Sequence, residues 1–138
     1  MNADGVKHYE THEYQGVCLP YDVLDSTIDD LKTFHVRQDD VFVVSYPKTG
    51  TTWTQEIASA AMHDGDIDTL NKSHSFKRVP FLELTLGGHV NKDLPRTHNM
   101  IAKAPMSSPR LIKSHLPGQL LPPQVWEKKV KIVYVIRN

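Results

Sequence analysis

Residues 41–53 read VFVVSYPKTGTTW, an apolar run that breaks into a polar loop and resumes at a tryptophan. The run over residues 41–45 is rich in β-branched and aromatic side chains, which predicts a central parallel strand buried on both faces. A helix is predicted over residues 53–62, and its apolar side would carry Trp53, Ile57, Ala60 and Ala61. The stretch therefore predicts a strand, a loop and a helix in that order.

The loop between this strand and this helix has the composition of an anion site. A turn that leads from a buried strand into a helix directs backbone N–H groups and the positive end of the helix dipole toward one point. Gly50 lets the backbone approach a ligand closely, and Lys48 supplies a mobile positive charge. Thr51 and Thr52 add hydroxyl and amide donors. Phosphate is the natural ligand of such a loop.

Two other interpretations of the loop compete with the anion site. Pro47 and Gly50 can simply form a turn, with Thr52 and Gln55 closing a capping box at the start of the helix. The ATP-binding P-loop requires Gly, four residues and then Gly-Lys-Ser/Thr, whereas Lys48 precedes the glycine here. The register excludes the ATP-binding motif, and at this point the choice between a turn and an anion site stays open.

The rest of the chain predicts an α/β fold. Residues 130–136 are apolar at nearly every position and form the second strong strand pattern, while residues 110–114 form a shorter one. Helical patterns cover residues 25–33, 79–84 and 122–129. Buried strands joined through helices predict a doubly wound parallel sheet. Residues 1–13 are polar and are expected to be flexible.

Composition excludes several classes of function. The 16 basic and 16 acidic side chains balance, with a pI near 7.1, so we expect neither nucleic acid nor an anionic membrane as a partner. Cys18 is the single cysteine, and the first thirty residues lack the basic and then apolar run of a signal peptide, so we expect a reducing, cytoplasmic location. No apolar run approaches the roughly 20 residues that span a bilayer. A metal is not expected, because His8 and His12 lack further ligands.

Residues 46–53, YPKTGTTW, closely resemble the 5′-phosphosulfate-binding loop of the cytosolic sulfotransferases. KRVPFLE at 77–83, PRLIKSHLP at 109–117 and KIVYVIRN at 131–138 are similar to further segments of that family, in the same order. The resemblance covers nearly the whole chain from about Tyr14. It implies a P-loop-like fold of three layers with a parallel central sheet, and 3′-phosphoadenylyl sulfate (PAPS) as the sulfuryl donor.

The matched residues also receive roles in catalysis. His115 is the candidate general base for a hydroxyl acceptor, because an imidazole titrates near neutrality. The resemblance implies that Lys48 stabilises negative charge on the bridging oxygen as the S–O bond breaks. Lys113 would orient the sulfuryl group or bind the acceptor oxygen. Transfer would then depend on positioning and charge stabilisation rather than on a metal.

The resemblance implies two binding sites. The donor site would comprise Lys48, Thr49, Gly50, Thr51, Thr52, Trp53 and Arg137. Trp53 would stack on the adenine, and the Arg137 guanidinium would pair with the 3′-phosphate. The acceptor site would comprise Pro80, Phe81, Lys113 and His115. Phe81 would form an aromatic wall that suits the hydroxyl or amine of a small lipophilic molecule.

The chain ends at Arg137-Asn138, inside the second signature of the family. The resemblance therefore implies that residues 1–138 are the N-terminal part of a single sulfotransferase domain, truncated after its second signature strand. The family's Arg-Lys-Gly loop and its dimer-forming segment lie outside this sequence, so a dimer is expected only where that segment is present. The alternative is a catalytically inactive nucleotide-binding fragment or scaffold.

Overall fold

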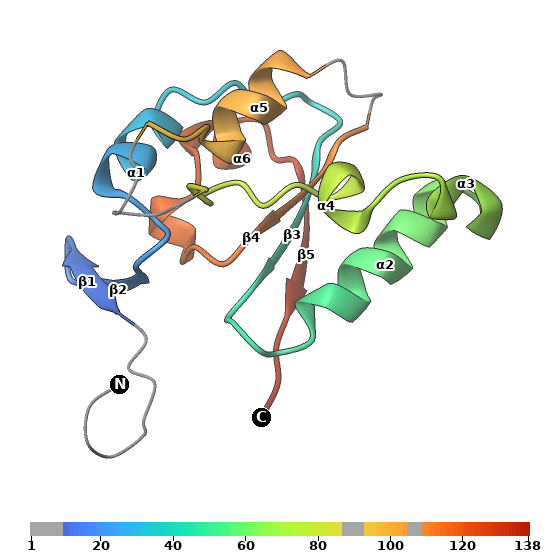
Figure 1. Cartoon of the computed structure of the whole chain (residues 1–138), viewed down its shortest axis with the longest axis horizontal. Helices are drawn as coiled ribbons and strands as arrows, with labels where there is room; N and C mark the ends of the chain where they lie inside the picture. Colours follow the sequence, from blue (N-terminus) through green and yellow to red (C-terminus); the bar gives the residue numbers. More distant parts are fainter. Residues whose placement is uncertain (1–9, 87–92, 105–108) are drawn as a thin grey trace.

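A computed structural model describes residues 10–86, 93–104 and 109–138 of the chain. Its centre is a parallel sheet of three strands in the order β4-β3-β5 (Figure 1). The strands are β3 (Val41–Ser45), β4 (Leu111–Ser114) and β5 (Lys131–Val135). Val41 lies opposite Leu111 on one side and Lys131 on the other. This arrangement confirms the predicted α/β fold with a parallel central sheet.

Helices cover both faces of this sheet, which gives the three predicted layers. Phe42 and Val44 of β3 belong to the larger core cluster, with residues of α1 (Asp25–Leu31) and α6 (Pro123–Glu127). Val43 faces the other way, into a cluster that packs against α2 (Thr51–Met62). Figure 1 shows the strands between α2 and the group of α1, α5 (Thr97–Lys103) and α6. Side chains from β3 therefore enter both cores, as a central parallel strand requires.

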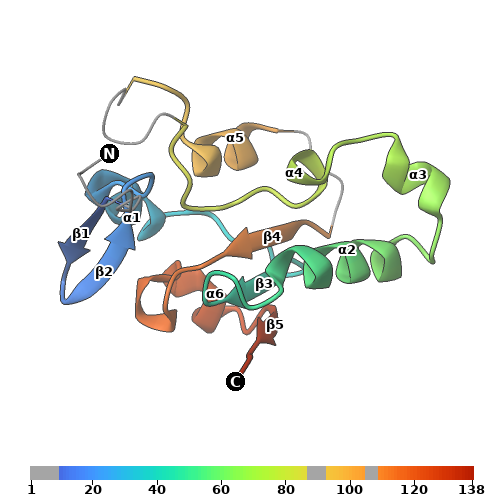
Figure 2. The same ribbon diagram turned by 60° about the horizontal axis from the view of Figure 1, so that its bottom comes forward.

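Further helical elements are short. They are α3 (Ile67–Asn71), α4 (Ser75–Arg78) and the 3-10 helix η1 (Gly118–Leu120). Figure 2 shows the chain passing from α2 through α3 and α4 toward α5 before it enters β4. Among the described residues, no helix is both long enough and apolar enough to cross a membrane.

Helix α2 does not bury the apolar side of its sequence pattern. Trp53 and Ile57 are 80% and 68% exposed, and the buried residues of this helix are Thr51, Gln55 and Ser59. The Ser45 and Thr51 hydroxyl groups are hydrogen-bonded to each other, which turns this side of the helix toward β3. Because Gln55 and Ser59 lie one and two turns beyond Thr51, they face the sheet too. Trp53 and Ile57, on another side of the helix, line a cavity.

The helix predicted over residues 79–84 does not form, because residues 80–82 are bonded to β4 and the chain then turns away. Val79 precedes a proline, a position that disfavours the helical conformation, and α4 ends before it. Lys113 N–H donates to the Pro80 carbonyl, and Leu82 N–H donates to the Lys113 carbonyl, each at 2.9 Å. The segment is therefore bonded to β4 in parallel, in the manner of a short further strand.

The N-terminal part of the chain forms a hairpin. β1 (Thr11–Tyr14) pairs antiparallel with β2 (Val17–Pro20), joined by Gln15 and Gly16 at positive φ. Hydrogen bonds of 2.9 Å from His12 to Asp25 and from Tyr14 to Asp29 attach it to α1. The prediction of a flexible segment is therefore wrong for residues 11–13, while residues 1–9, including His8, lie outside the described residues.

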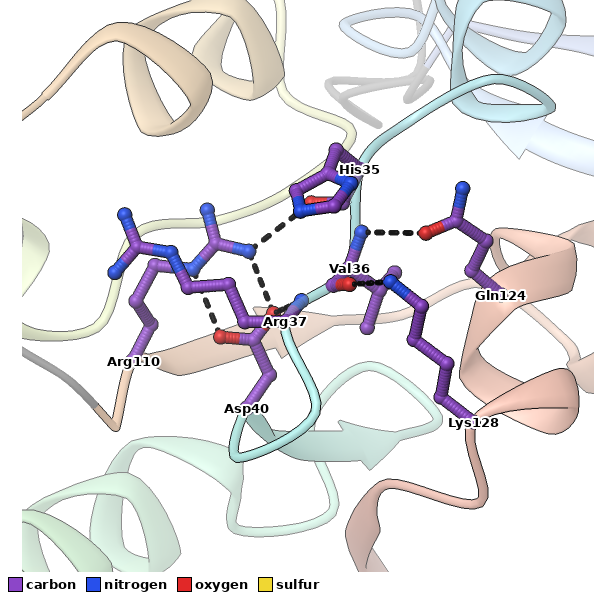
Figure 3. A network of polar contacts seen from close by, with 7 residues as sticks. All are labelled: His35, Val36, Arg37, Asp40, Arg110, Gln124 and Lys128. Carbon is purple, nitrogen blue, oxygen red and sulfur yellow. Dashed lines mark hydrogen bonds and ion pairs between the residues drawn. The ribbon is translucent and has the colours of Figure 1, made fainter.

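A buried polar network holds the opposite end of the sheet from the loop (Figure 3). Arg110 donates to both oxygens of the Asp40 carboxylate, at 2.8 and 2.5 Å, and to the His35 carbonyl at 3.1 Å. Asp40 and Arg110 are both about 2% exposed or less. Val41 N–H donates to the Arg110 carbonyl at 2.9 Å, so this ion pair lies where β3 and β4 begin. It fixes their register, and hence the residues at their carboxyl ends.

Candidate active site

The loop after β3 is shaped to present backbone N–H groups. Lys48 and Gly50 both have positive φ, at 67° and 110°. A side chain at Gly50 would meet no atom within 4 Å, so glycine is favoured there by conformation rather than by space. Within the described part of the chain, nothing accepts a hydrogen bond from the N–H groups of Lys48, Thr49 or Gly50. Together with the start of α2, they form a concentration of unpaired donors.

The competing capping-box interpretation does not describe this loop. Gly50 is the N-cap of α2, and no side chain caps the helix. Thr49 instead uses its hydroxyl to donate to the Tyr46 carbonyl at 2.7 Å, which closes the turn. Gln55 is buried against the sheet. The first N–H groups of the helix therefore remain available to a ligand.

His115 follows β4 and reaches across to the end of β3. Its Nδ1 lies 2.8 Å from the Ser45 carbonyl oxygen and 3.3 Å from the Ser45 hydroxyl. A carbonyl only accepts, so Nδ1 carries the proton and Nε2 of the neutral ring carries the lone pair. Burial lowers the pKa of His115, and the nearby Lys113 charge acts in the same direction, against the opposing hydrogen bond to Ser45. The ring is therefore neutral near pH 7, with a basic nitrogen.

Lys113 and Phe81 are neighbours of this histidine. The Lys113 ammonium lies 4.5 Å from the centroid of the Phe81 ring, and the Phe81 and His115 rings meet edge to face at 5.0 Å. Burial lowers the pKa of Lys113, and the charge of Glu83 opposes that shift. The aromatic ring thus contacts a cation on one side and an imidazole on the other.

Glu83 is a site residue that the sequence reasoning missed. Its side chain is 1% exposed, and Oε1 accepts a hydrogen bond from the backbone N–H of His115 at 2.6 Å. Burial raises the pKa of Glu83 to about 7, although the hydrogen bond from His115 works against that rise. An acidic residue at the end of the apolar segment VPFLE was the available signal. Its partner, 32 positions away, is not visible in the sequence.

Two cavities meet at this group of residues. The first, of about 780 Å³, is lined by the loop together with Trp53, Ile57 and Arg137. The second, of about 1050 Å³, is lined largely by apolar and aromatic side chains, including Phe81, with Glu83 at its wall. Pro47, Lys48 and His115 line both cavities. A ligand in one cavity and a ligand in the other would therefore approach each other at Lys48 and His115.

The structure brings together most of the predicted site residues. Those lining the first cavity are Lys48, Thr49, Gly50, Thr51, Thr52, Trp53, Lys113, His115 and Arg137. Phe81 lines the second cavity, whereas Pro80 is buried, lines neither, and holds Lys113 through its carbonyl. Among the described residues, no group of three or more His, Cys, Asp or Glu side chains is placed to hold a metal ion.

Comparison with known proteins gives consistent matches. A family model described as a sulfotransferase domain matches residues 38–138. The chain is 36% identical to human sulfotransferase 1E1 and 40% identical to the rat protein of that name, in both cases over its full length. It spans 44% of the length of each of these curated relatives.

A solved structure agrees with these matches. The mouse sulfotransferase SULT7A1, complexed with PAP, superposes with a TM-score of 0.63 and 27% sequence identity. The match covers 93% of this chain and 39% of the mouse chain. The family match over residues 38–138, the full-length identity to two curated sulfotransferases and the shared fold lead to one conclusion. The chain belongs to the sulfotransferase family.

Proposed function

We propose that the protein transfers a sulfuryl group from PAPS to the hydroxyl or amine of a small lipophilic acceptor. The observation that carries this proposal is the meeting of two cavities at Lys48 and His115. One cavity is lined by unpaired backbone donors and cations, and the other largely by apolar side chains. A transferase needs this arrangement, because donor and acceptor must be held with their reacting atoms close together.

The first cavity suits the nucleotide donor. Free N–H groups of the loop and the start of α2 match a 5′-phosphosulfate, and Lys48 adds a positive charge. Trp53 is exposed along the same cavity and would offer a face for the adenine, while Arg137 also lines the cavity and would bind the 3′-phosphate. The mouse sulfotransferase that shares this fold is complexed with PAP, which supports the same nucleotide here.

The residues at the junction supply the chemistry. His115 Nε2 takes the acceptor proton as the acceptor oxygen forms its bond to sulfur. Lys48 stabilises the negative charge that develops on the bridging oxygen as the S–O bond to the phosphate breaks, which releases PAP. Lys113 lies beside His115 and orients the sulfuryl group. The hydrogen bond from Nδ1 to Ser45 matters because it keeps the lone pair on Nε2.

The second cavity sets the acceptor class. Its wall includes Phe81, Leu121, Trp126 and Tyr134, and this apolar lining favours phenols, steroids and other lipophilic alcohols. We also propose a cytoplasmic location. The exposed thiol of Cys18 is free, as is usual in a reducing compartment.

A transfer assay tests the proposal. The chain is incubated with PAPS labelled on sulfur and a panel of phenols and steroid alcohols, and labelled product is counted. In His115→Ala, we expect transfer to fall by about 10²- to 10⁴-fold, the usual contribution of a general base, while affinity for PAP changes little. The matched control is His35→Ala, whose side chain is exposed and outside both cavities. Equal loss of transfer and of PAP binding in His115→Ala would contradict the base assignment, and PAP binding without any transfer would favour the inactive nucleotide-binding alternative.

A further inference from the structure

The segment that contacts β4 ends in an unusual way. Lys113 and Phe81 form a parallel bridge, in which Lys113 N–H donates to the Pro80 carbonyl and Leu82 N–H donates to the Lys113 carbonyl. The next rung of a parallel ladder would join His115 N–H to the Leu82 carbonyl. Instead, His115 N–H donates to the side-chain carboxyl of Glu83 at 2.6 Å. A side chain has replaced the backbone acceptor.

The backbone turns away at this point. Leu84 N–H donates back to the Phe81 carbonyl at 3.4 Å, and Thr85 N–H donates to the Asp22 carbonyl at 2.9 Å. Without the Glu83 carboxyl, the main chain of His115 would leave β4 with no partner on this side. The bond is shorter than most N–H···O hydrogen bonds and its acceptor is 1% exposed, so it is shielded from competing water.

From this geometry we propose that Glu83 is a positioning residue for His115, holding its main chain so that the imidazole stays against Ser45 with Nε2 at the junction of the two cavities. The role rests on the sulfuryl transfer proposed above. His115 is then held at three points, namely its N–H by Glu83, its Nδ1 by Ser45 and its ring by Phe81. Loss of the bond to Glu83 would let the imidazole ring move away from Ser45. A displacement of about 1 Å is enough to slow a positioned reaction about 100-fold.

Side-chain chemistry allows a sharp test. In Glu83→Gln the amide oxygen still accepts from His115 N–H, whereas in Glu83→Ala no acceptor is left. Glu83→Asp keeps a carboxyl but shortens its reach by one methylene. If Glu83 only stabilised the fold, each variant would lower the fraction of folded protein without altering the His115 ring in the molecules that remain folded. A positioning role is instead rescued by Gln and not by Asp.

The first measurement does not depend on activity. Nitrogen NMR of the His115 ring in the 138-residue chain reports which nitrogen carries the proton. In the wild type and in Glu83→Gln we expect the proton on Nδ1. In Glu83→Ala and Glu83→Asp we expect a shift toward protonated Nε2, because the bond to the Ser45 carbonyl is lost. The control Glu127→Ala, on the exposed side of α6, should match the wild type.

The second measurement is kcat per folded molecule in the transfer assay. We expect a fall of about 100-fold in Glu83→Ala and a value within about tenfold of the wild type in Glu83→Gln, with KM for the donor unchanged. A wild-type tautomer and kcat in folded Glu83→Ala would overturn the positioning role. If Glu83→Ala does not fold, the same result in Glu83→Asp overturns it. If the wild type transfers nothing, the proposed function fails, and the NMR measurement still decides whether Glu83 positions His115.

Discussion

Burial of Glu83 predicts a specific dependence of stability on pH. The pKa of this carboxyl rises from 4.5 to about 7 because the group is buried. The folded protein therefore binds a proton at Glu83 more tightly than the unfolded chain does. Between pH 4.5 and about 7 the unfolded chain loses that proton first, so the contribution of Glu83 to stability falls as the pH rises through this window.

The contribution of Glu83 to this pH dependence can be isolated with Glu83→Gln, because the amide resembles the protonated carboxyl and does not titrate. One pKa unit corresponds to roughly 1.4 kcal/mol, so the rise in pKa corresponds to about 3 kcal/mol of unfolding free energy. At pH 5 we expect the variant and the wild type to have similar stability. At pH 8 we expect the variant to be more stable by up to about 3 kcal/mol, because only the wild type then buries a charge.

Urea denaturation at pH 5 and pH 8 measures both proteins. Lys113 and His115 are present in both proteins, so the difference between the proteins reports on the Glu83 carboxyl together with its charge interaction with Lys113. Burial lowers the pKa of His115, which destabilises both proteins as the pH falls below 6.5, and this shared effect cancels. A difference in unfolding free energy that stays the same at pH 5 and pH 8 would refute the assignment of a buried, titrating carboxyl.

Other consequences of the structure can be measured in the same chain. Asp40→Asn leaves the buried Arg110 without its counter-charge. In urea denaturation, this variant should lose about 3–5 kcal/mol of unfolding free energy. A loss below about 1 kcal/mol would show that the ion pair does not fix the sheet. Trp53→Ala should weaken PAP binding about five- to 100-fold, the range for stacking on a base. Because Trp53 is 80% exposed, the variant protein should unfold at the same temperature as the wild type. Unaltered PAP binding in this variant would remove Trp53 from the donor site.

The main features of the fold were predictable because they depend on local patterns. The apolar run before the loop and the one near the C-terminus are strands in the structure, and the loop between residues 46 and 50 joins a strand to a helix as expected. Strand β5 is nevertheless more exposed than its apolar sequence predicts, since Val133 and Tyr134 are 37% and 63% exposed. An apolar run identifies a strand, but its burial depends on what lies beside it.

The features that differ from prediction depend on how the elements pack against one another. Helix α2 turns Thr51, Gln55 and Ser59 toward the sheet, and the bond between the Ser45 and Thr51 hydroxyls accompanies this orientation. The extended form of residues 80–82 depends on pairing with β4, about 30 positions later. Glu83 was missed for the same reason, because nothing near it in the sequence shows that its carboxyl binds the backbone of His115.

The central claim is that the loop after β3 binds the donor nucleotide. Calorimetric titration of the 138-residue chain with PAP tests this claim most directly. We expect a dissociation constant on the order of micromolar. In Lys48→Met, affinity should fall about ten- to 100-fold, as expected for loss of a charged hydrogen bond. A chain that unfolds cooperatively, and is therefore folded, but releases no heat of binding with PAP would contradict the claim.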